Sequence, residues 1–229
     1  MKEKLAAQAK GYGLLAVGLV IMAFGVAFSI QAGLGTSPIS SLPYVVDLIS
    51  PLTVGTATIC MHVVFILLQI LILRRRYDPI QLMQLPVALV FGGLTDLAVW
   101  VIQDVGSEWY AGRWGLCLVG ILLVAVGVAC EVTAGVVTLA GEGFVLAVCK
   151  VTGLPFGNMK VAFDLTLVAS ACLLSLLFLH RLEGVREGTA AAALLVGLLA
   201  KRMQPGMKRW FDRVRGETPC GKRRLRKRT

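Results

Sequence analysis

The stretch GLLAVGLVIMAFGVAFSI, Gly13–Ile30, contains no charged residue, and its length decides the fold class. A helix needs about 20 apolar residues to cross the hydrocarbon core of a bilayer, and it pairs its backbone amides within its own segment. Further apolar runs lie at Thr53–Leu73, Leu82–Gln103, Trp114–Ala134, Met159–Leu179 and, shorter and Ala-rich, Gly188–Lys201. We therefore expect an all-α integral membrane protein with about six spanning helices.

The composition agrees with this class. Hydrophobic residues make up 57% of the chain and charged residues 16%, against roughly 45–50% and 25% in soluble domains. Continuous runs rich in Leu, Ala and Gly disfavour an outer-membrane barrel, whose strands alternate. The basic start of the chain is also typical of a secretory signal. The first run has full membrane length, however, and no clear small-x-small cleavage site follows it, which favours an uncleaved first span.

The placement of Lys and Arg predicts that both termini lie in the cytoplasm, and the expected location of the chain is a cell (inner) membrane. In that orientation only Arg113, Arg181 and Arg186 of the 23 basic residues lie outside. The tail, 203–229, is expected to be irregular and ends in KRRLRKR at Lys222–Arg228. Contact with anionic lipid headgroups is the favoured interpretation, and nucleic-acid binding is the less favoured one. The sequence leaves a homo-oligomer open.

A comparison of the chain with itself indicates a duplication. An offset of 102 residues superposes the first three apolar runs on the last three, and it aligns Gly18 with Gly120, Gly25 with Gly127 and Ala32 with Ala134. Because each half then holds three spans, an odd number, the halves would enter the membrane from opposite sides. Such inverted repeats are common in transporters. The expected organisation is a first repeat at 1–103, an external connection at 104–113, a second repeat at 114–202 and the tail.

A short segment follows the first span of each half. The first reads AGLGTSPISSLPYVVDLISPLTVG, Ala32–Gly55, and the second AGVVTLAGEGFVLAVCKVTGLPFG, Ala134–Gly157. Each predicts a broken or re-entrant helix too short to span, at about Pro38–Leu48 and Glu142–Val151. A Ser-Pro start and an acidic first turn both favour a helix N-terminus. Residues 33–50 and 137–153 could instead lie on the bilayer surface, with glycines that permit tight helix crossings.

Ionisable side chains inside apolar runs cost at least a few kcal/mol and are therefore candidate functional groups. His62 and Asp164 occupy equivalent places in the second and fifth spans, and Asp96 lies in the third. Structural alternatives exist: an ion pair of Asp164 with Lys160, or a hydrogen bond from His62 to a nearby backbone. Glu131 is expected near solvated headgroups. Asp96 has no basic residue within a turn, so it requires an interhelical partner or a proton.

The segments GLGTSPISSLPYVVD and TVGT, with AGEGFVLAV and LPFGNMKVAFDLT, resemble the YczE/YyaS/YitT group of bacterial membrane proteins over about residues 10–202. Gly33–Pro38 matches the group's first motif, Gly-Leu-Gly-x-x-Pro. Gly141, Glu142 and Gly143 correspond to its Gly/acidic/Gly element. The resemblance implies a small multi-spanning protein without an established activity, so it supports the fold and identifies no substrate.

Known catalytic and metal-binding patterns are missing from the sequence, including HExxH, GxSxG, the P-loop and CxxC. We therefore expect no enzyme, no cofactor and no metal. The leading hypothesis is a gradient-driven secondary transporter or permease for a small solute. The expected solute-binding residues are Gly35, Thr36, Ser37, Ser40, Gly141, Glu142 and Gly143, and the expected proton- or ion-coupling residues are His62, Asp96 and Asp164. The alternatives are a membrane accessory or regulatory protein that packs against a partner membrane protein, and a lipid-acting membrane enzyme, which lacks a visible nucleophile–base pair.

Overall fold

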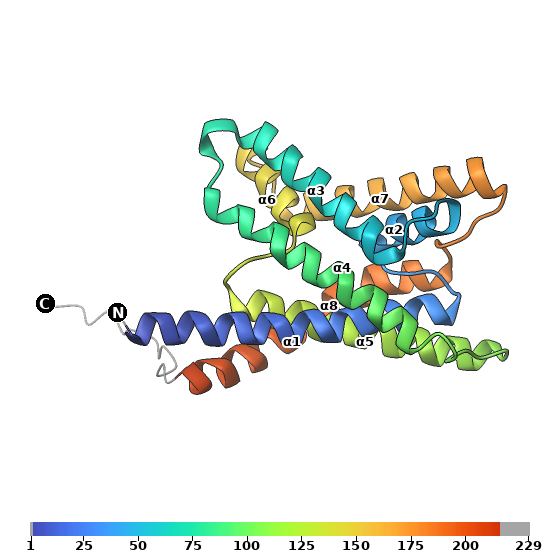
Figure 1. The fold of residues 1–229 in the computed structure, drawn as a ribbon, viewed down its shortest axis with the longest axis horizontal. Coiled ribbons are helices and arrows are strands. Elements are labelled where there is room, and N and C mark those ends of the chain that lie inside the picture. The colour runs from blue at the N-terminus through green and yellow to red at the C-terminus, as the bar shows by residue number, and fades with distance from the viewer. Residues whose placement is uncertain (1, 216–229) are drawn as a thin grey trace, which may run out of the picture.

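A computed structural model describes residues 2–215, and every regular element in that range is helical (Figure 1). The elements are α1 (Lys2–Ala32), α2 (Pro38–Ile49), α3 (Val54–Leu73), the 3-10 turns η1 (Arg74–Arg76) and η2 (Pro79–Met83), α4 (Gln84–Val101), α5 (Tyr110–Ala134), α6 (Ala140–Thr152), α7 (Phe156–Leu179) and α8 (Glu187–Arg215). The expected all-α class is therefore confirmed for the described residues.

Five segments of the described chain are long and apolar enough to cross a membrane. They are Gln8–Ala32, Val54–Arg76, Pro79–Val101, Tyr110–Ala134 and Phe156–Leu179. These segments contain or largely overlap the first five apolar runs. The sixth run, Gly188–Lys201, is not among them. It forms only the first half of α8, and charged residues follow it directly within the same helix.

Two helices extend beyond the segment limits expected from the sequence. The tail was expected to be irregular from residue 203, yet α8 continues through Pro205 to Arg215. A proline removes one backbone hydrogen bond inside a helix, but α8 keeps contacts beyond it: Phe211 is buried, and Lys10 Nζ donates to the Val214 carbonyl at 2.8 Å. The connection expected at 104–113 is shorter, because α5 begins at Tyr110. The basic cluster Lys222–Arg228 lies outside the described residues.

The long helices α1 and α5 pack along each other and run in opposite directions (Figure 1). Four glycines make this contact close. A Cβ on Gly18 would lie 3.1 Å from the Gly127 carbonyl oxygen, and one on Gly25 would lie 2.9 Å from that of Gly120. Small residues of this kind allow helix backbones to approach closely in membranes. These are the glycines that the 102-residue offset aligns.

A glycine ends each of these two helices. Gly33 follows α1 and Gly135 follows α5, and both have a φ of 61°. This left-handed conformation costs glycine little and costs other residues more. It lets the chain reverse into the short helices α2 and α6, which lie within two residues of the bounds expected for them. The structure thus confirms a short helix after the first long helix of each half.

The short helix of each half packs on a long helix of the other half. The first half's α2 packs on α7 of the second half, and α6 of the second half packs on α3 of the first. The hairpins α3–α4 and α7–α8 differ, however. Helices α3 and α4 pack together, with Gly55 against Gly92, whereas α7 makes no comparable packing with α8. A Cβ on Gly157, the residue equivalent to Gly55, would meet no atom within 4 Å.

Candidate functional site

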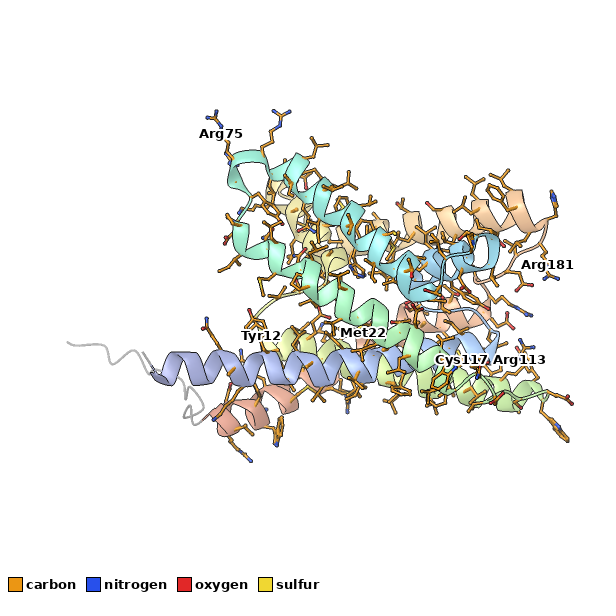
Figure 2. All side chains as sticks on the ribbon, in the orientation of Figure 1. Tyr12, Met22, Arg75, Arg113, Cys117 and Arg181 are labelled. Carbon is orange, nitrogen blue, oxygen red and sulfur yellow. The ribbon has the colours of Figure 1, made fainter. Side chains whose placement is uncertain are left out.

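The candidate site is a cavity of about 240 Å³ to which all eight α-helices or their N-caps contribute. Met22, which lines the cavity, lies in the middle of the molecule in Figure 2, between Arg75 at one end and Arg113 and Arg181 at the other. The lining residues that carry polar side chains are Ser37, Ser40, Thr58, His62, Glu142, Lys160 and Asp164. Most of the remaining wall is aliphatic, with one aromatic ring from Phe91.

The first turn of α2 forms one wall. Ser37 is the N-cap and Pro38 occupies the first helical position, where its missing amide hydrogen costs nothing. The Ser37 hydroxyl donates to the Ser40 hydroxyl at 3.0 Å. Backbone amides of Ser40 and Ser41 both donate to the Ser37 carbonyl at 2.9 Å. The amides of this turn are therefore largely used within the helix, while both serine side chains line the cavity.

The first turn of α6 forms the facing wall. Glu142 lines the cavity, and its Oε2 has no hydrogen-bond partner among the described residues. Gly141 lies against the side chain of Ile39 of α2, so the two short helices touch at their N-terminal ends. Ile39 and Gly141 are equivalent under the 102-residue offset. Contact between equivalent positions is what a two-fold relation between the halves produces at its axis.

Helix α3 contributes His62, which is only 1% exposed. The rings of Phe65 and Phe91 each make a T-shaped contact with the imidazole ring, with ring centroids 6.4 Å apart in both pairs. The His62 Nδ1 has no hydrogen-bond partner within residues 2–215. The backbone hydrogen bond considered for this histidine is therefore not made through Nδ1. A buried ring nitrogen without a partner is costly unless a ligand or water satisfies it.

Helix α7 contributes Lys160 and Asp164, one turn apart. Lys160 Nζ donates to Asp164 Oδ1 at 2.7 Å, so the local ion pair considered from the sequence is present. Lys160 also lies 5.5 Å from the centre of the Phe163 ring. Both charged side chains are about a quarter exposed, and both line the cavity. The pair therefore belongs to the candidate site as well as to the helix.

The lining is organised in equivalent pairs. Seven pairs of positions separated by 102 residues both line the cavity: Met22 and Val124, Val26 and Val128, Ser37 and Leu139, Ser40 and Glu142, Thr58 and Lys160, His62 and Asp164, Phe91 and Ala193. The offset comes from the sequence, and the position of these pairs on one cavity is a separate observation from the structure. Polar groups at equivalent places differ in kind, which makes the cavity chemically asymmetric.

Several expected site residues lie elsewhere. Asp96 does not line the cavity. It lies beside the start of α3, where Oδ2 accepts from the Thr53 hydroxyl at 2.6 Å and Oδ1 from the Gly55 amide at 2.7 Å. This is the interhelical partner that the sequence required. Gly35 packs against the α7–α8 connection at Arg186, and Gly143 packs against Gln69 and Gln84.

Thr36 and Gly141 lie next to the cavity without lining it. Thr36 is 1% exposed, and its Oγ1 has no partner in the described part of the chain. Gly141 serves the contact of α6 with α2. Of the ten residues proposed from the sequence, the cavity therefore brings together Ser37, Ser40, His62, Glu142 and Asp164.

Two ionisable residues lie in surroundings that the sequence did not predict. Glu131 was expected in solvated headgroups, but it is 2% exposed and its Oε1 accepts from the Leu139 amide at 2.6 Å. The α5–α6 connection folds back over the last turn of α5 and removes Glu131 from solvent. Lys160 was assigned to the inner surface, yet it lines the cavity. Its position one turn before Asp164 inside an apolar run was the signal available in the sequence.

Five helices of membrane-crossing length, packed around a cavity with buried polar groups, are those of an all-helical membrane-embedded protein. The chain belongs to the family of unknown function DUF6198, which it matches over residues 9–205. This match does not confirm the resemblance to the YczE/YyaS/YitT group. No curated protein and no solved structure matches the chain.

Proposed function

We propose that the protein is a secondary transporter or permease for a small solute, with the solute bound in the cavity between the two halves. The observation that carries this proposal is the lining of the cavity by equivalent residues of both halves, next to the touching N-terminal ends of α2 and α6. Sites at the meeting point of two repeats, formed by short or broken helices, are typical of secondary transporters.

The proposal includes an inverted repeat of six spans in an inner membrane, with the apolar half of α8 as the sixth span. Support comes from α1 and α5, which run in opposite directions, and from the starts of α6, α7 and α8, which lie within one residue of the starts of α2, α3 and α4 shifted by the offset. Support for cytoplasmic termini comes from the basic residues: Arg75 lies toward the N-terminal end of α1, and Arg113 and Arg181 lie at the opposite end (Figure 2). This follows the positive-inside rule.

The two hairpins suggest how the cavity is reached. At the outer end, the Asp96 carboxylate joins α4 to the start of α3. The equivalent of Asp96 is Leu198, which is 64% exposed and faces no such partner at the start of α7. The proposed state is therefore closed outside, between α3 and α4, and open inside, between α7 and α8. If α3 separated from α4 while α7 packed against α8, the cavity would open to the outside and close to the inside. This change would give alternating access.

In this proposal His62, Glu142 and Asp164 bind the solute or a coupling proton. Asp96 keeps a functional part, but at the outer closure and not in the cavity. No nucleotide-driven element is invoked, so a gradient supplies the energy. A carboxyl that changes partners between two states is a suitable carrier of such coupling.

The test uses purified protein in liposomes, in a cysteine-free chain that carries Gly157→Cys and Leu194→Cys on α7 and α8. Solute uptake under a proton or sodium gradient is measured before and after oxidation. We expect oxidation to stop uptake and reduction to restore it, because the cross-link requires the inner side to close. The single-cysteine variants, oxidised in parallel, should keep full uptake. Absence of gradient-driven uptake of any solute in a broad metabolite screen would reject transport.

A second candidate function is that of an accessory protein that packs against a partner membrane protein. The observation in its favour is α7, where only 22% of the most apolar window is buried inside the chain, against 39–50% for the other four candidate spans. Lipid would also cover such a face. Purification in mild detergent distinguishes the two: one fixed partner, lost when Leu165 and Leu173 are changed to Trp, would favour the accessory role.

A further inference from the structure

The charges around the cavity do not balance. Among the described residues, three carboxyl groups and one ammonium group lie on its wall or directly behind it: Glu131, Glu142, Asp164 and Lys160. The single cation is already paired with Asp164. Glu131 accepts one hydrogen bond, from the amide of Leu139, a cavity residue. Glu142 is thus the cavity carboxyl without a cationic partner at salt-bridge distance.

Three buried polar atoms at this place lack partners. They are the Oε2 atoms of Glu131 and Glu142 and the Nδ1 of His62, none of which has a hydrogen-bond partner in residues 2–215. The His62 side chain is only 1% exposed, and it lines the cavity. Leaving such atoms unsatisfied is expensive in a low-dielectric interior. A ligand that donates hydrogen bonds and carries positive charge would satisfy the acceptors.

An anionic ligand is a poor match in spite of the two helix N-termini. In α2, Pro38 has no amide hydrogen, and the amides of Ser40 and Ser41 are used by Ser37. In α6, the amide of Leu139 is taken by Glu131, and Glu142 itself places a carboxylate at the first turn. Little N–H capacity is therefore left at the start of α2, and the carboxylates of Glu131 and Glu142 already lie at the positive end of α6.

The volume of the cavity and the apolar part of its wall limit the size and the hydrocarbon part of the ligand. The cavity of about 240 Å³ limits the ligand to a small molecule. Met22, Met61, Val26 and Phe91 supply apolar and aromatic surface. Thioether and ring groups adapt to small hydrocarbon bodies, and an aromatic face also attracts a cation.

We propose that the cavity binds a small organic monocation, an amine whose ammonium group pairs with Glu142 and whose apolar body packs against the Met61 and Phe91 side of the cavity. His62 supplies a further hydrogen-bonding group in the same cavity. The proposal rests on the proposed function, since it names the substrate class of that site. Lys160 stays with Asp164 and opposes a second positive charge, so the ligand is expected to be a monocation.

The experiment measures binding of radiolabelled benzylamine to the purified full chain in detergent by equilibrium dialysis. Benzyl alcohol and benzoate, a neutral and an anionic analogue of the same shape, are used as competitors. Benzylamine, n-butylamine and methylamine test the size of the apolar body. We expect saturable benzylamine binding that the amines displace and that the alcohol and the carboxylate do not.

Two variants with opposite expected effects make the test specific. Glu142→Gln should weaken benzylamine binding about tenfold or more, because it removes one partner of a buried charge pair. Lys160→Gln should strengthen binding, because it removes the competing cation from Asp164. Glu108→Gln, which changes an exposed carboxyl, should leave binding as in the wild type. If Glu142→Gln does not fold, the Lys160→Gln variant still decides the question.

The possible results separate this inference from the transport proposal. Equal displacement by benzyl alcohol, or unchanged binding in Glu142→Gln together with unchanged binding in Lys160→Gln, would overturn the cationic site. Benzylamine binding without uptake into liposomes would keep the site and reject transport. Uptake of a solute that is not an amine, with no amine bound, would keep transport and reject this inference.

Discussion

Gly25 of α1 and Gly120 of α5 lie backbone to backbone: a Cβ on Gly25 would be 2.9 Å from the Gly120 carbonyl oxygen and 2.7 Å from the Val124 amide nitrogen. The pair Gly18 and Gly127 repeats this contact further along the same two helices. The offset aligns Gly18 with Gly120 and Gly25 with Gly127, whereas the contacts in the structure join Gly18 to Gly127 and Gly25 to Gly120. This crossed arrangement is the one that a two-fold axis between α1 and α5 would produce.

The first prediction concerns this contact. Gly25→Leu should destabilise the protein by about 1–3 kcal/mol, because the added side chain meets backbone atoms that cannot move alone. Thermal unfolding in detergent, followed by the loss of monodisperse protein, measures the effect. Gly93→Leu is the matched control, since a Cβ there meets nothing within 4 Å. Equal losses in both variants would show that the α1–α5 contact is not tight.

The second prediction concerns the outer closure. Asp96→Ala removes the acceptor of the Thr53 hydroxyl and the Gly55 amide, so the start of α3 should separate from α4 more often. A single cysteine at Thr58 should then react with a membrane-impermeant maleimide added from outside. Asp78→Ala is the control, because Asp78 accepts from the Ile80 amide at the opposite end of the hairpin. Outside labelling that is unchanged in Asp96→Ala would contradict the closure.

The third prediction concerns the anchor of α6. Gln69 is fully buried, and its Nε2 donates to Gln84 Oε1 at 3.0 Å and to the Ala140 carbonyl at 3.1 Å. Gln69→Leu should cost about 1–3 kcal/mol, because it removes both hydrogen bonds and leaves the buried Gln84 Oε1 without its donor. Thermal unfolding of the variant measures this cost, with the exposed Gln103→Leu as control.

The double variant Gln69→Leu with Gln84→Leu refines this third prediction. It should recover part of the lost stability, because the Gln84 acceptor that Gln69→Leu leaves unsatisfied is removed with it. Additive losses from the two substitutions would instead mean that the two glutamines act independently.

The fourth prediction concerns sidedness. Arg75 and Arg181 are exposed and lie at opposite ends of the molecule (Figure 2). In a cysteine-free chain, Arg75→Cys should react with an impermeant maleimide only in inside-out vesicles, and Arg181→Cys only in intact cells. Labelling of both from the same side would reject the spanning arrangement. Reversed labelling would keep the arrangement and place the termini outside.

Local sequence was sufficient for much of the fold. Continuous apolar runs predicted the five long helices, because backbone amides without water must pair within their own segment. Gly33 with the Ser37-Pro38 start predicted the end of α1 and the start of α2. The glycines that the offset aligns lie where α1 and α5 meet, but that contact was seen only in the structure. The sequence did not predict that α8 continues past Pro205 into the charged segment. The helix continues there because it lies against neighbouring helices, and such contacts are not visible in local sequence.

The site divides in the same way. The sequence by itself pointed to His62 and Asp164 as polar exceptions inside apolar runs, and to Glu142 as the acidic residue in the first turn of the second short helix. Only the tertiary structure decided that these three share one cavity with Lys160, while Asp96 lies at the start of α3. The physical reason is that the role of a buried polar group depends on its hydrogen-bond or ion-pair partner. Where that partner lies on another helix, the packing of the helices decides which two groups meet. His62 and Asp164 lie 102 residues apart in the chain, and they line one cavity only because the helices of the two halves pack together.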